Sequence, residues 1–469
     1  MKDKIIWLGF ILISLALFIY FLFSAPVQLA GDIAEYYGIT QSLINHQGFN
    51  LTPQDQIDLE KVLHKAYFSD PTYYIQGIEG KRYPVHFVFY SILALPVRII
   101  LSLFSINPLK SLSITNLSIF LATNLVILKN FIKSTSKRII YLILIFLSPL
   151  VFFISWPGVD IFYICMLMLA VFSFYNKKYP MSVIFASLAS WHSQPLIIVW
   201  FDFLAYLTFK KRKVNWYLAV SSFFLVCLPY LYNYLAFEVL TPWTIFREGW
   251  TERFGFGLQN ASFKKFFELF FDLNMGFFWY APFIFIFGAY SFFKTSKKRK
   301  ILIFTLLLLI TTAFFYQTNP AWHYGTAGYG PSRHSLYLLP FLIYFIVEEF
   351  KKTSRTTVFI ILLIITQSYI LYFNSFLSPK FQKTLYHSPY ARFVLNNAPF
   401  LYNPTPEIFV DRTAHTDKKY ISSAVYKYGS ECKKAYILKG EEDLLMKVCG
   451  SLSKEQLKYD KFGGAYIDY

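Results

Sequence analysis

Two carboxylic acids and a tyrosine follow the first hydrophobic segment of this 469-residue chain, in the run GDIAEY at 31–36. If the run is helical, offsets of three and four residues place Asp32, Glu35 and Tyr36 on one face. A carboxylate at the edge of a hydrophobic segment can reach water and remove a proton from a hydroxyl group as a general base. The same spacing fits an ordinary helix start, where acidic residues interact with the positive end of the helix dipole.

Cations and aromatic residues occur in other polar segments that we place on the same side. Lys81 and Arg82 directly precede Tyr83, and Arg333 precedes His334 in a later segment. Lys and Arg can hold a departing phosphate, on which negative charge builds up. Tyrosine rings can stack on sugars and lie comfortably at a membrane interface. Together with the two acids, these cationic and aromatic side chains predict a reaction on a lipid-linked sugar phosphate.

Metal chemistry is an alternative for the histidines of these segments. Five of them could supply ligands, namely His46, His86, His192, His323 and His334. Interfacial histidines more often bond to the backbone, and the chain has no Cys-x-x-Cys or Cys/His metal spacing. We therefore assign no metal and no cofactor, while a divalent ion stays open as an alternative.

The composition is that of a polytopic helical membrane protein. The chain is 55% hydrophobic and 21% aromatic, with a mean hydropathy of +0.42. Apolar stretches near the roughly 20 residues that a bilayer core requires recur from Ile5 to Phe376. Because unpaired backbone groups are not tolerated in lipid, these stretches must be helices. We expect about eleven transmembrane helices, the first of them a retained anchor helix at Ile5 to Phe23.

The net charge of +18 does not point to nucleic acid, because the basic residues form small clusters at the ends of apolar segments. Such clusters mark the cytoplasmic side and contact anionic lipid. The predicted protein lies in the inner (cytoplasmic) membrane, with its N-terminus inside and its C-terminus outside. Its expected transmembrane domain is 1–376, with outer loops at 25–84, 233–275 and 317–333. Residues 377–469 are expected to form a small extracytoplasmic domain or cap.

The sequence predicts further structure in the first outer loop and in the segments between 107 and 209. In the first outer loop, 34–45 and 55–66 read as amphipathic helices at the membrane surface. The segments between 107 and 209 can be threaded in two ways. Four simple crossings would put Lys129 to Arg138 outside, against the charge rule. We favour the other threading, in which 109–128 does not cross, 181–209 breaks at 191–195, and 156–160 faces outside.

The four cysteines divide by environment. Cys165 and Cys227 lie in apolar segments, where cysteine is usually a packing residue. Cys432 and Cys449 lie in the polar C-terminal region, where an oxidising compartment would allow a disulfide.

The order of these features resembles the GT-C superfamily of membrane glycosyltransferases. A span, a Gly-Asp-x-x-x-Tyr stretch, a long outer loop ending in KRYP at 81–84 and a second span are similar to bacterial protein O-mannosyltransferases and aminoarabinose transferases. The runs SPL at 148–150 and WPGVD at 156–160 resemble the second acidic site of the family. The likeness covers Met1 to about Phe376.

This resemblance implies an inverting glycosyltransferase that uses a polyprenyl-phosphate sugar donor and an acceptor hydroxyl on a glycan, lipid or protein. It implies Asp32 as general base and Asp160 as second carboxylate, with Lys81, Arg82 and Arg333 as cations. Many relatives have adjacent Asp and Glu, whereas here the glutamate comes later, at Glu35, which we keep as a third catalytic candidate. The predicted substrate-binding residues are Tyr36, Lys81, Arg82, Tyr83, Arg333 and His334. Alternatives from other classes are a lipid or solute transporter without bond-making activity and a scaffold that has lost catalysis.

Overall fold

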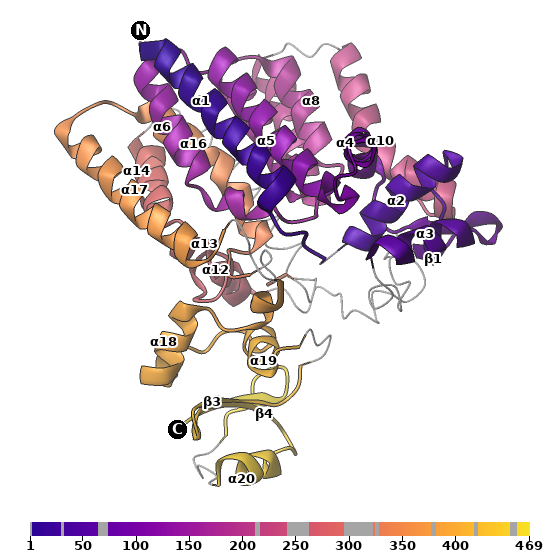
Figure 1. The fold of residues 1–469 in the computed structure, drawn as a ribbon. Coiled ribbons are helices and arrows are strands. Elements are labelled where there is room, and N and C mark those ends of the chain that lie inside the picture. Colours follow the sequence, from indigo (N-terminus) through magenta and orange to yellow (C-terminus); the bar gives the residue numbers. More distant parts are fainter. Residues whose placement is uncertain are drawn as a thin grey trace. The chain divides into compact units, whose positions relative to one another are not determined.

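The chain forms two compact units in a computed structural model that describes residues 2–29, 32–63, 74–211, 216–241, 262–294, 322–323, 328–376, 381–416, 421–450 and 457–469. Unit 1 comprises Met1–Thr251, Phe283–Thr312 and Leu336–Ser378, and unit 2 comprises Glu252–Pro282, Ala313–Ser335 and Pro379–Tyr469. Each unit is considered by itself (Figure 1).

Over the residues that the structure describes, unit 1 is a helical bundle with a short hairpin. Its helices are α1 Lys2–Ile19, α2 Ile33–His46, α3 Pro53–Leu63, α4 Phe89–Leu103, α5 Ser111–Asn130, α6 Thr135–Phe146, α7 Asp160–Tyr175, α8 Tyr179–Ala189, α9 Ile197–Ala205, α10 Trp216–Phe237, α14 Pro282–Lys294, α16 Leu339–Glu349 and α17 Ser354–Phe373. The hairpin pairs β1 Tyr74–Gln76 with β2 Arg82–Pro84. The amphipathic helices expected at 34–45 and 55–66 correspond to α2 and α3, and residues 64–66 lie outside the described part.

Four helices of the described residues have the length and composition to cross a membrane. They are Asp3–Ser24, Pro108–Asn130, Trp216–Phe237 and Thr356–Phe373. Shorter apolar helices accompany them, among them α4, α7, α8 and α14. The largely helical fold with these apolar helices is that of an α-helical membrane protein.

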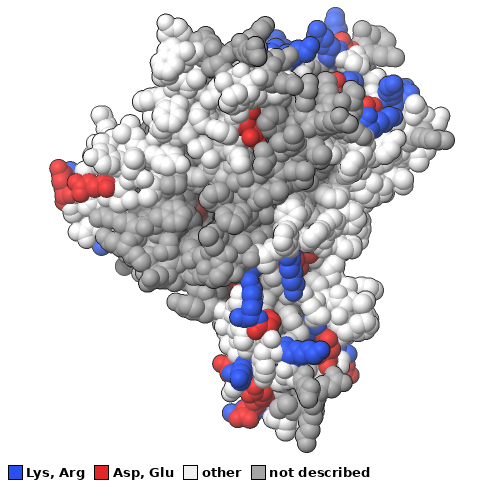
Figure 2. All heavy atoms as spheres, turned by 180° about the vertical axis from the view of Figure 1, so that it is seen from behind, with Lys and Arg blue, Asp and Glu red and all other residues white. Residues whose placement is uncertain are grey.

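Contacts within unit 1 identify which segments share the end of the bundle from which α1 starts. Asp3 accepts a hydrogen bond from the Thr135 hydroxyl at 2.7 Å and lies 3.6 Å from the Arg138 guanidinium. Lys137 pairs with Glu348 at 3.2 Å. Lys and Arg gather at this end in the space-filling view (top of Figure 2). The threading that kept the basic segment 129–138 on the side of the N-terminus agrees with these contacts.

The opposite end of the bundle corrects one expectation about the crossing segments. The Lys110 ammonium donates to the Leu22 carbonyl at 2.8 Å, so α5 starts beside the far end of α1. Residues 109–128 therefore run the length of the bundle, contrary to the threading that we favoured. The 15-residue α4 is only about 22 Å long, and it connects the β1–β2 hairpin to Lys110 at that same end. It is shorter than the four helices that are long enough to cross a membrane, so its crossing, which the sequence suggested, stays a prediction.

Two further features of 107–209 fit the threading that we favoured, the break at 191–195 and the position of 156–160 away from the N-terminus, whereas the side of the membrane that 156–160 faces stays a prediction. α8 ends at Ala189, and a separate short helix begins at Gln194, which is the break expected at 191–195. The Asn116 amide, near the start of α5, donates to the carbonyls of Trp156 at 2.8 Å and Gly158 at 3.2 Å. The segment 156–160 thus lies at the end of unit 1 opposite to Lys2.

Unit 2 joins the C-terminal region to two segments that the sequence reading placed in outer loops. It contains α12 Phe263–Phe271, α13 Phe277–Tyr280, α18 Pro389–Asn397, α19 Pro406–Ala414, α20 Asp443–Cys449 and an antiparallel sheet in the order β3 Ala424–Tyr428, β4 Glu431–Leu438 and β5 Gly464–Asp468. Its core packs α18 and α19 against the sheet around Phe409 and Tyr436. Cys432 and Cys449 form the expected disulfide. The unit is therefore larger than the tail predicted from hydropathy.

Candidate functional site

The site is built around Glu35, in the first turn of α2. This side chain is fully buried, and its carboxylate accepts two hydrogen bonds from one residue. The backbone N–H of His86 donates to Oε1 at 2.6 Å, and His86 Nδ1 lies 2.7 Å from Oε2. Such a two-point contact fixes both the carboxylate plane and the imidazole ring.

The β1–β2 hairpin carries His86 to this acid. Tyr74 in β1 pairs with Pro84 in β2, two residues before the histidine. The Tyr74 hydroxyl donates to the Glu35 backbone carbonyl at 2.9 Å and ties the hairpin to α2. Gly38 makes room for this ring, since a Cβ there would lie 2.2 Å from the Tyr74 oxygen. The long outer loop thus positions a histidine against the acid that follows the first span.

Asp32 completes a cluster of three potential ligands with Glu35 and His86. One ligand atom from each lies within 4.8 Å of the others. Asp32 occupies the N-cap position of α2, yet its side chain makes no capping hydrogen bond, and it is partly exposed. The carboxylate is therefore available to a substrate or a cation, whereas Glu35 is engaged by His86. Oxygen and imidazole ligands suit a divalent ion. Asp32, Glu35 and His86 therefore fit the divalent-metal site that the sequence analysis left open as an alternative.

Asp160 belongs to the same end of unit 1 and is connected to α2 through aromatic side chains. The buried Tyr36 ring packs edge-on against Tyr90, with centroids 5.2 Å apart. The Tyr90 hydroxyl donates to the Asn116 side-chain oxygen at 3.0 Å, and Asn116 holds the loop that precedes Asp160. The Tyr163 hydroxyl donates to the Asp160 carboxylate. The two acids named from the sequence are thus parts of one packed region.

Burial and neighbouring acids shape the electrostatics of this region. Burial raises the pKa of Glu35, and the adjacent His86 opposes that change. Burial raises the pKa of Tyr36 well above its ordinary value, and the charges of Asp32, Glu35 and Asp160 act in the same direction. Tyr36 therefore stays a neutral phenol, and its burial makes it an interior packing residue rather than an open stacking surface for a sugar.

The cations predicted in the outer loop do not contact the acid cluster among the described residues. The Lys81 ammonium pairs with Glu79 at 2.6 Å in the exposed hairpin turn. The Arg82 side chain is exposed, and its backbone pairs with Gln76 and Leu51. Tyr83 packs on the Phe237 ring, with centroids 5.9 Å apart. Of these three residues, Arg82 has the side chain best able to reach an added anion.

Two predicted residues, Arg333 and His334, lie in unit 2 and are not placed relative to the cluster. Arg333 is partly exposed, whereas His334 is buried and is not an open ligand. Both begin a short helical turn, Arg333–Leu338. Their part in substrate binding stays a prediction.

The other histidines have structural partners. His46 pairs with Asp55 at 2.9 Å and joins α2 to α3. His192 packs against the rings of Phe87 and Phe162. His323 receives a hydrogen bond from Arg412 at 2.9 Å in the buried interior of unit 2. Among the five candidates, the structure selects His86 as the one that joins acids in a cluster.

Sequence reasoning missed the partnership of Glu35 and His86. It also missed Arg98, a buried cation on α4 that donates to the Tyr37 carbonyl and the Thr40 hydroxyl of α2. A histidine just after the KRYP run was the only available signal for the first of these. Comparison of the chain with protein-family models, curated proteins and solved structures finds no match.

Proposed function

We propose that this protein is a membrane glycosyltransferase of GT-C type that moves a sugar from a polyprenyl-phosphate donor to an acceptor hydroxyl. The proposal places about eleven spans in a cytoplasmic membrane and the reaction at its outer face. It is carried by the Asp32 carboxylate, which makes no capping hydrogen bond and lies beside the Glu35–His86 pair at the start of α2, eight residues after the first apolar helix ends at Ser24. An acid at this position can meet both a lipid headgroup and a water-soluble acceptor.

In the proposed reaction, Asp32 accepts the proton of the acceptor hydroxyl as general base. The resulting oxygen nucleophile attacks the anomeric carbon from the face opposite the phosphate. The new glycosidic bond forms as the bond between carbon and phosphate oxygen breaks, so the configuration inverts and polyprenyl phosphate leaves. Glu35 is a positioning residue, because its carboxylate fixes His86, and the His86 ring lies beside the Asp32 carboxylate, where we propose that it orients the base and the acceptor. Asp160 supplies the second carboxylate of the resemblance.

The departing phosphate requires a cation, and the proposal assigns this role to Arg82. Arg82 is exposed two residues before Pro84 in the strand that leads to His86. A guanidinium binds phosphate oxygens through paired N–H groups, which a lysine cannot reproduce. Lys81 contributes less in this scheme, because Glu79 already neutralises it. A divalent ion at Asp32, Glu35 and His86 would be a further source of positive charge.

The test compares cells of the source organism that carry wild-type protein, Asp32→Asn or Asp58→Asn. Asp58 is the matched control, because it is an acid of α3 whose salt bridge with Lys61 is at the surface. Mass spectrometry of lipid extracts and glycoconjugates follows the sugar donor and its product. We expect Asp32→Asn to lose the product and accumulate the lipid-linked sugar, with normal amounts of protein in the membrane. A fully active Asp32→Asn enzyme would refute the assignment.

A transport assay distinguishes a glycosyltransferase from the alternative, a lipid or solute transporter that makes no bond. Purified protein in liposomes is given a lipid-linked sugar and, as a source of acceptors, cell-envelope extract of the source organism. Both the location and the covalent state of the sugar are then measured. Translocation of an unchanged donor by wild type and by Asp32→Asn would identify a flippase. Formation of a new glycosidic bond by wild type alone supports transfer.

A further inference from the structure

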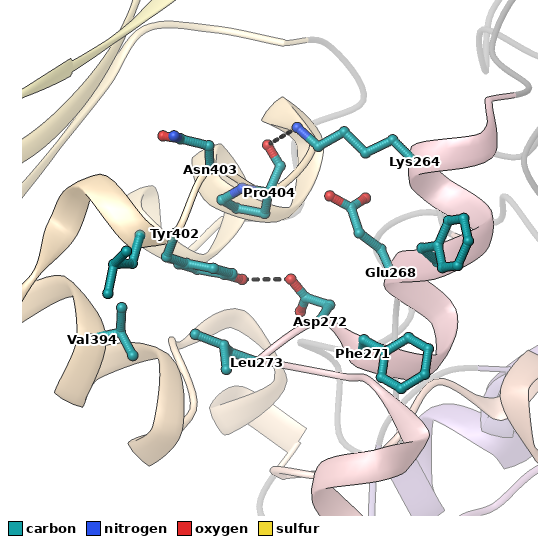
Figure 3. Close-up of a pocket in the computed structure, with 11 residues that line it drawn as sticks. Lys264, Glu268, Phe271, Asp272, Leu273, Val394, Tyr402, Asn403 and Pro404 are labelled. Carbon is teal, nitrogen blue, oxygen red and sulfur yellow. Dashed lines mark hydrogen bonds between the residues drawn. The ribbon is translucent and has the colours of Figure 1, made fainter.

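Unit 2 contains a cavity of about 570 Å³ that the proposed reaction does not use. Its volume is within the range of about 300–1,000 Å³ that is usual for small-molecule sites. One wall is α12, and the other is formed by α18 and the segment that precedes α19 (Figure 3). Its lining residues are Lys264, Phe267, Glu268, Phe271, Asp272, Leu273, Val394, Leu401, Tyr402, Asn403 and Pro404.

Glu268 is the feature that marks this cavity as a binding site. The residue is only 8% exposed, and in Figure 3 its carboxyl group projects from α12 toward Pro404. Oε1 accepts the Thr405 backbone N–H at 2.7 Å. The Thr405 hydroxyl also lies near this carboxyl, but Oε2 has no hydrogen bond of normal geometry among the described residues. A buried polar atom without a partner costs free energy, so a ligand that bonds to it gains affinity.

The neighbouring acid, Asp272, has hydrogen-bond partners on both of its oxygens. Asp272 lies one helical turn further along α12, and it accepts hydrogen bonds from the backbone N–H groups of Asn274 and Met275. Its other oxygen accepts the Tyr402 hydroxyl at 2.6 Å, the contact drawn in Figure 3. Asp272 thus holds the walls together, and Glu268 is the acid left to meet a ligand.

Charge selects among ligand classes. Burial, with the nearby Asp272, raises the pKa of Glu268 to about 8, so this carboxyl is largely neutral at pH 7. A neutral carboxyl both donates and accepts, which matches a hydroxyl group. A cationic ligand would face the Lys264 ammonium, which is held at this cavity by the Pro404 carbonyl at 3.1 Å. An anion would meet one cation, Lys264, against the two carboxyl groups of Glu268 and Asp272. An entirely apolar ligand would leave Glu268 Oε2 unpaired.

The rim supplies flat apolar surfaces beside these polar groups. Phe267 and Leu401 are 58% and 69% exposed, and Asn403 is exposed beside them. Aromatic rings cover the apolar faces of sugar rings, while carboxyl and amide groups bond to the hydroxyls at their edges. We propose that this cavity of unit 2 binds a neutral, hydroxyl-rich carbohydrate through Glu268, Asn403 and Phe267. The inference does not depend on glycosyl transfer, because it concerns binding alone.

The test applies the purified full chain in detergent to a printed array of neutral oligosaccharides and of their amino- and carboxyl-substituted counterparts. We expect binding to neutral glycans, weakened about tenfold or more in Glu268→Leu and in Phe267→Ala. Glu268→Gln should restore most of the binding, because its amide also donates and accepts. The control is Glu431→Gln, which changes an exposed acid paired with Lys433.

Each outcome bears on the inference. Phe267 is exposed, so Phe267→Ala tests the cavity even if Glu268→Leu reduces the yield of folded protein. Equal binding by wild type, Glu268→Leu and Phe267→Ala would place the glycan elsewhere and overturn the inference. Absence of binding to neutral glycans, or binding to charged ones alone, would also overturn it. Neither result affects the transfer test, which is measured at Asp32.

Discussion

Replacing Glu35 by glutamine tests the idea that this acid positions His86. Both Glu35 oxygens accept hydrogen bonds from His86, at 2.6 and 2.7 Å, in a fully buried position. The amide of glutamine retains one acceptor and carries no charge. Hydrogen bonds to charged groups contribute about 1.5–3 kcal/mol and neutral ones about 1 kcal/mol. We therefore expect Glu35→Gln to destabilise the conformation in which His86 contacts residue 35 by about 1–3 kcal/mol. This lowers the ratio of that conformation to the others by a factor of roughly 5–150.

The assay measures thermal unfolding and the rate of sugar transfer for the same purified samples. Since Glu35 acts through His86, turnover should fall by a similar factor of about 5–150, with a smaller change in KM. Asp32→Asn should behave differently, with turnover lost and the unfolding temperature unchanged, because the Asp32 side chain caps nothing. Glu60→Gln, an acid on α3 bonded to Gln56, is the matched control. A Glu35→Gln protein with wild-type turnover and stability would refute the positioning role.

Three further outcomes follow from the contacts of single groups. Lys81→Ala should change transfer less than about twofold, because an exposed pair with Glu79 contributes little; a tenfold loss would return Lys81 to the phosphate site. Burial raises the pKa of Glu268 from 4.5 to about 8, so between these values the unfolded chain is ionised while the folded chain keeps its proton. Wild-type stability should therefore fall with rising pH relative to Glu268→Gln, by at most about 1.4 kcal/mol per pH unit, and parallel pH curves from thermal unfolding would exclude this. Cys432→Ser with Cys449→Ser opens a loop with a sequence separation of 17, and denaturant titration of unit 2 should show a loss of about 3 kcal/mol, whereas unchanged stability would argue against the disulfide.

Local patterns predicted much of unit 1. The amphipathic periodicity near 34–45 gave α2, and the polar run at 191–195 gave the break between α8 and the next helix. The basic cluster ending at Arg138 was correctly placed with the N-terminus, because lysine and arginine avoid the membrane interior wherever the chain permits. These features depend on neighbours in sequence, which a pattern can record.

The crossing segments were harder to assign. Phe89–Leu103 is apolar but short for a span, and its Tyr90 hydroxyl donates to the Leu112 carbonyl at the start of α5. Its Arg98 bonds to α2 instead of lying in lipid, and that contact joins residues about 60 positions apart in sequence. Hydropathy measures the affinity of a segment for an apolar environment. The protein interior beside α2 is such an environment, and so is lipid, so hydropathy alone does not distinguish them.

The sequence by itself determined that this chain is helical, membrane-bound and acidic just after its first apolar segment, because composition and short-range spacing carry that information. Only the tertiary structure decided which acid is open and which is engaged. Glu35 and His86 are 51 positions apart, and their contact requires the hairpin to fold back on α2. The cavity beside Glu268 arises in the same way, from helices whose residues are more than a hundred positions apart. Long-range packing sets these environments, and the environment decides what a carboxyl group can do.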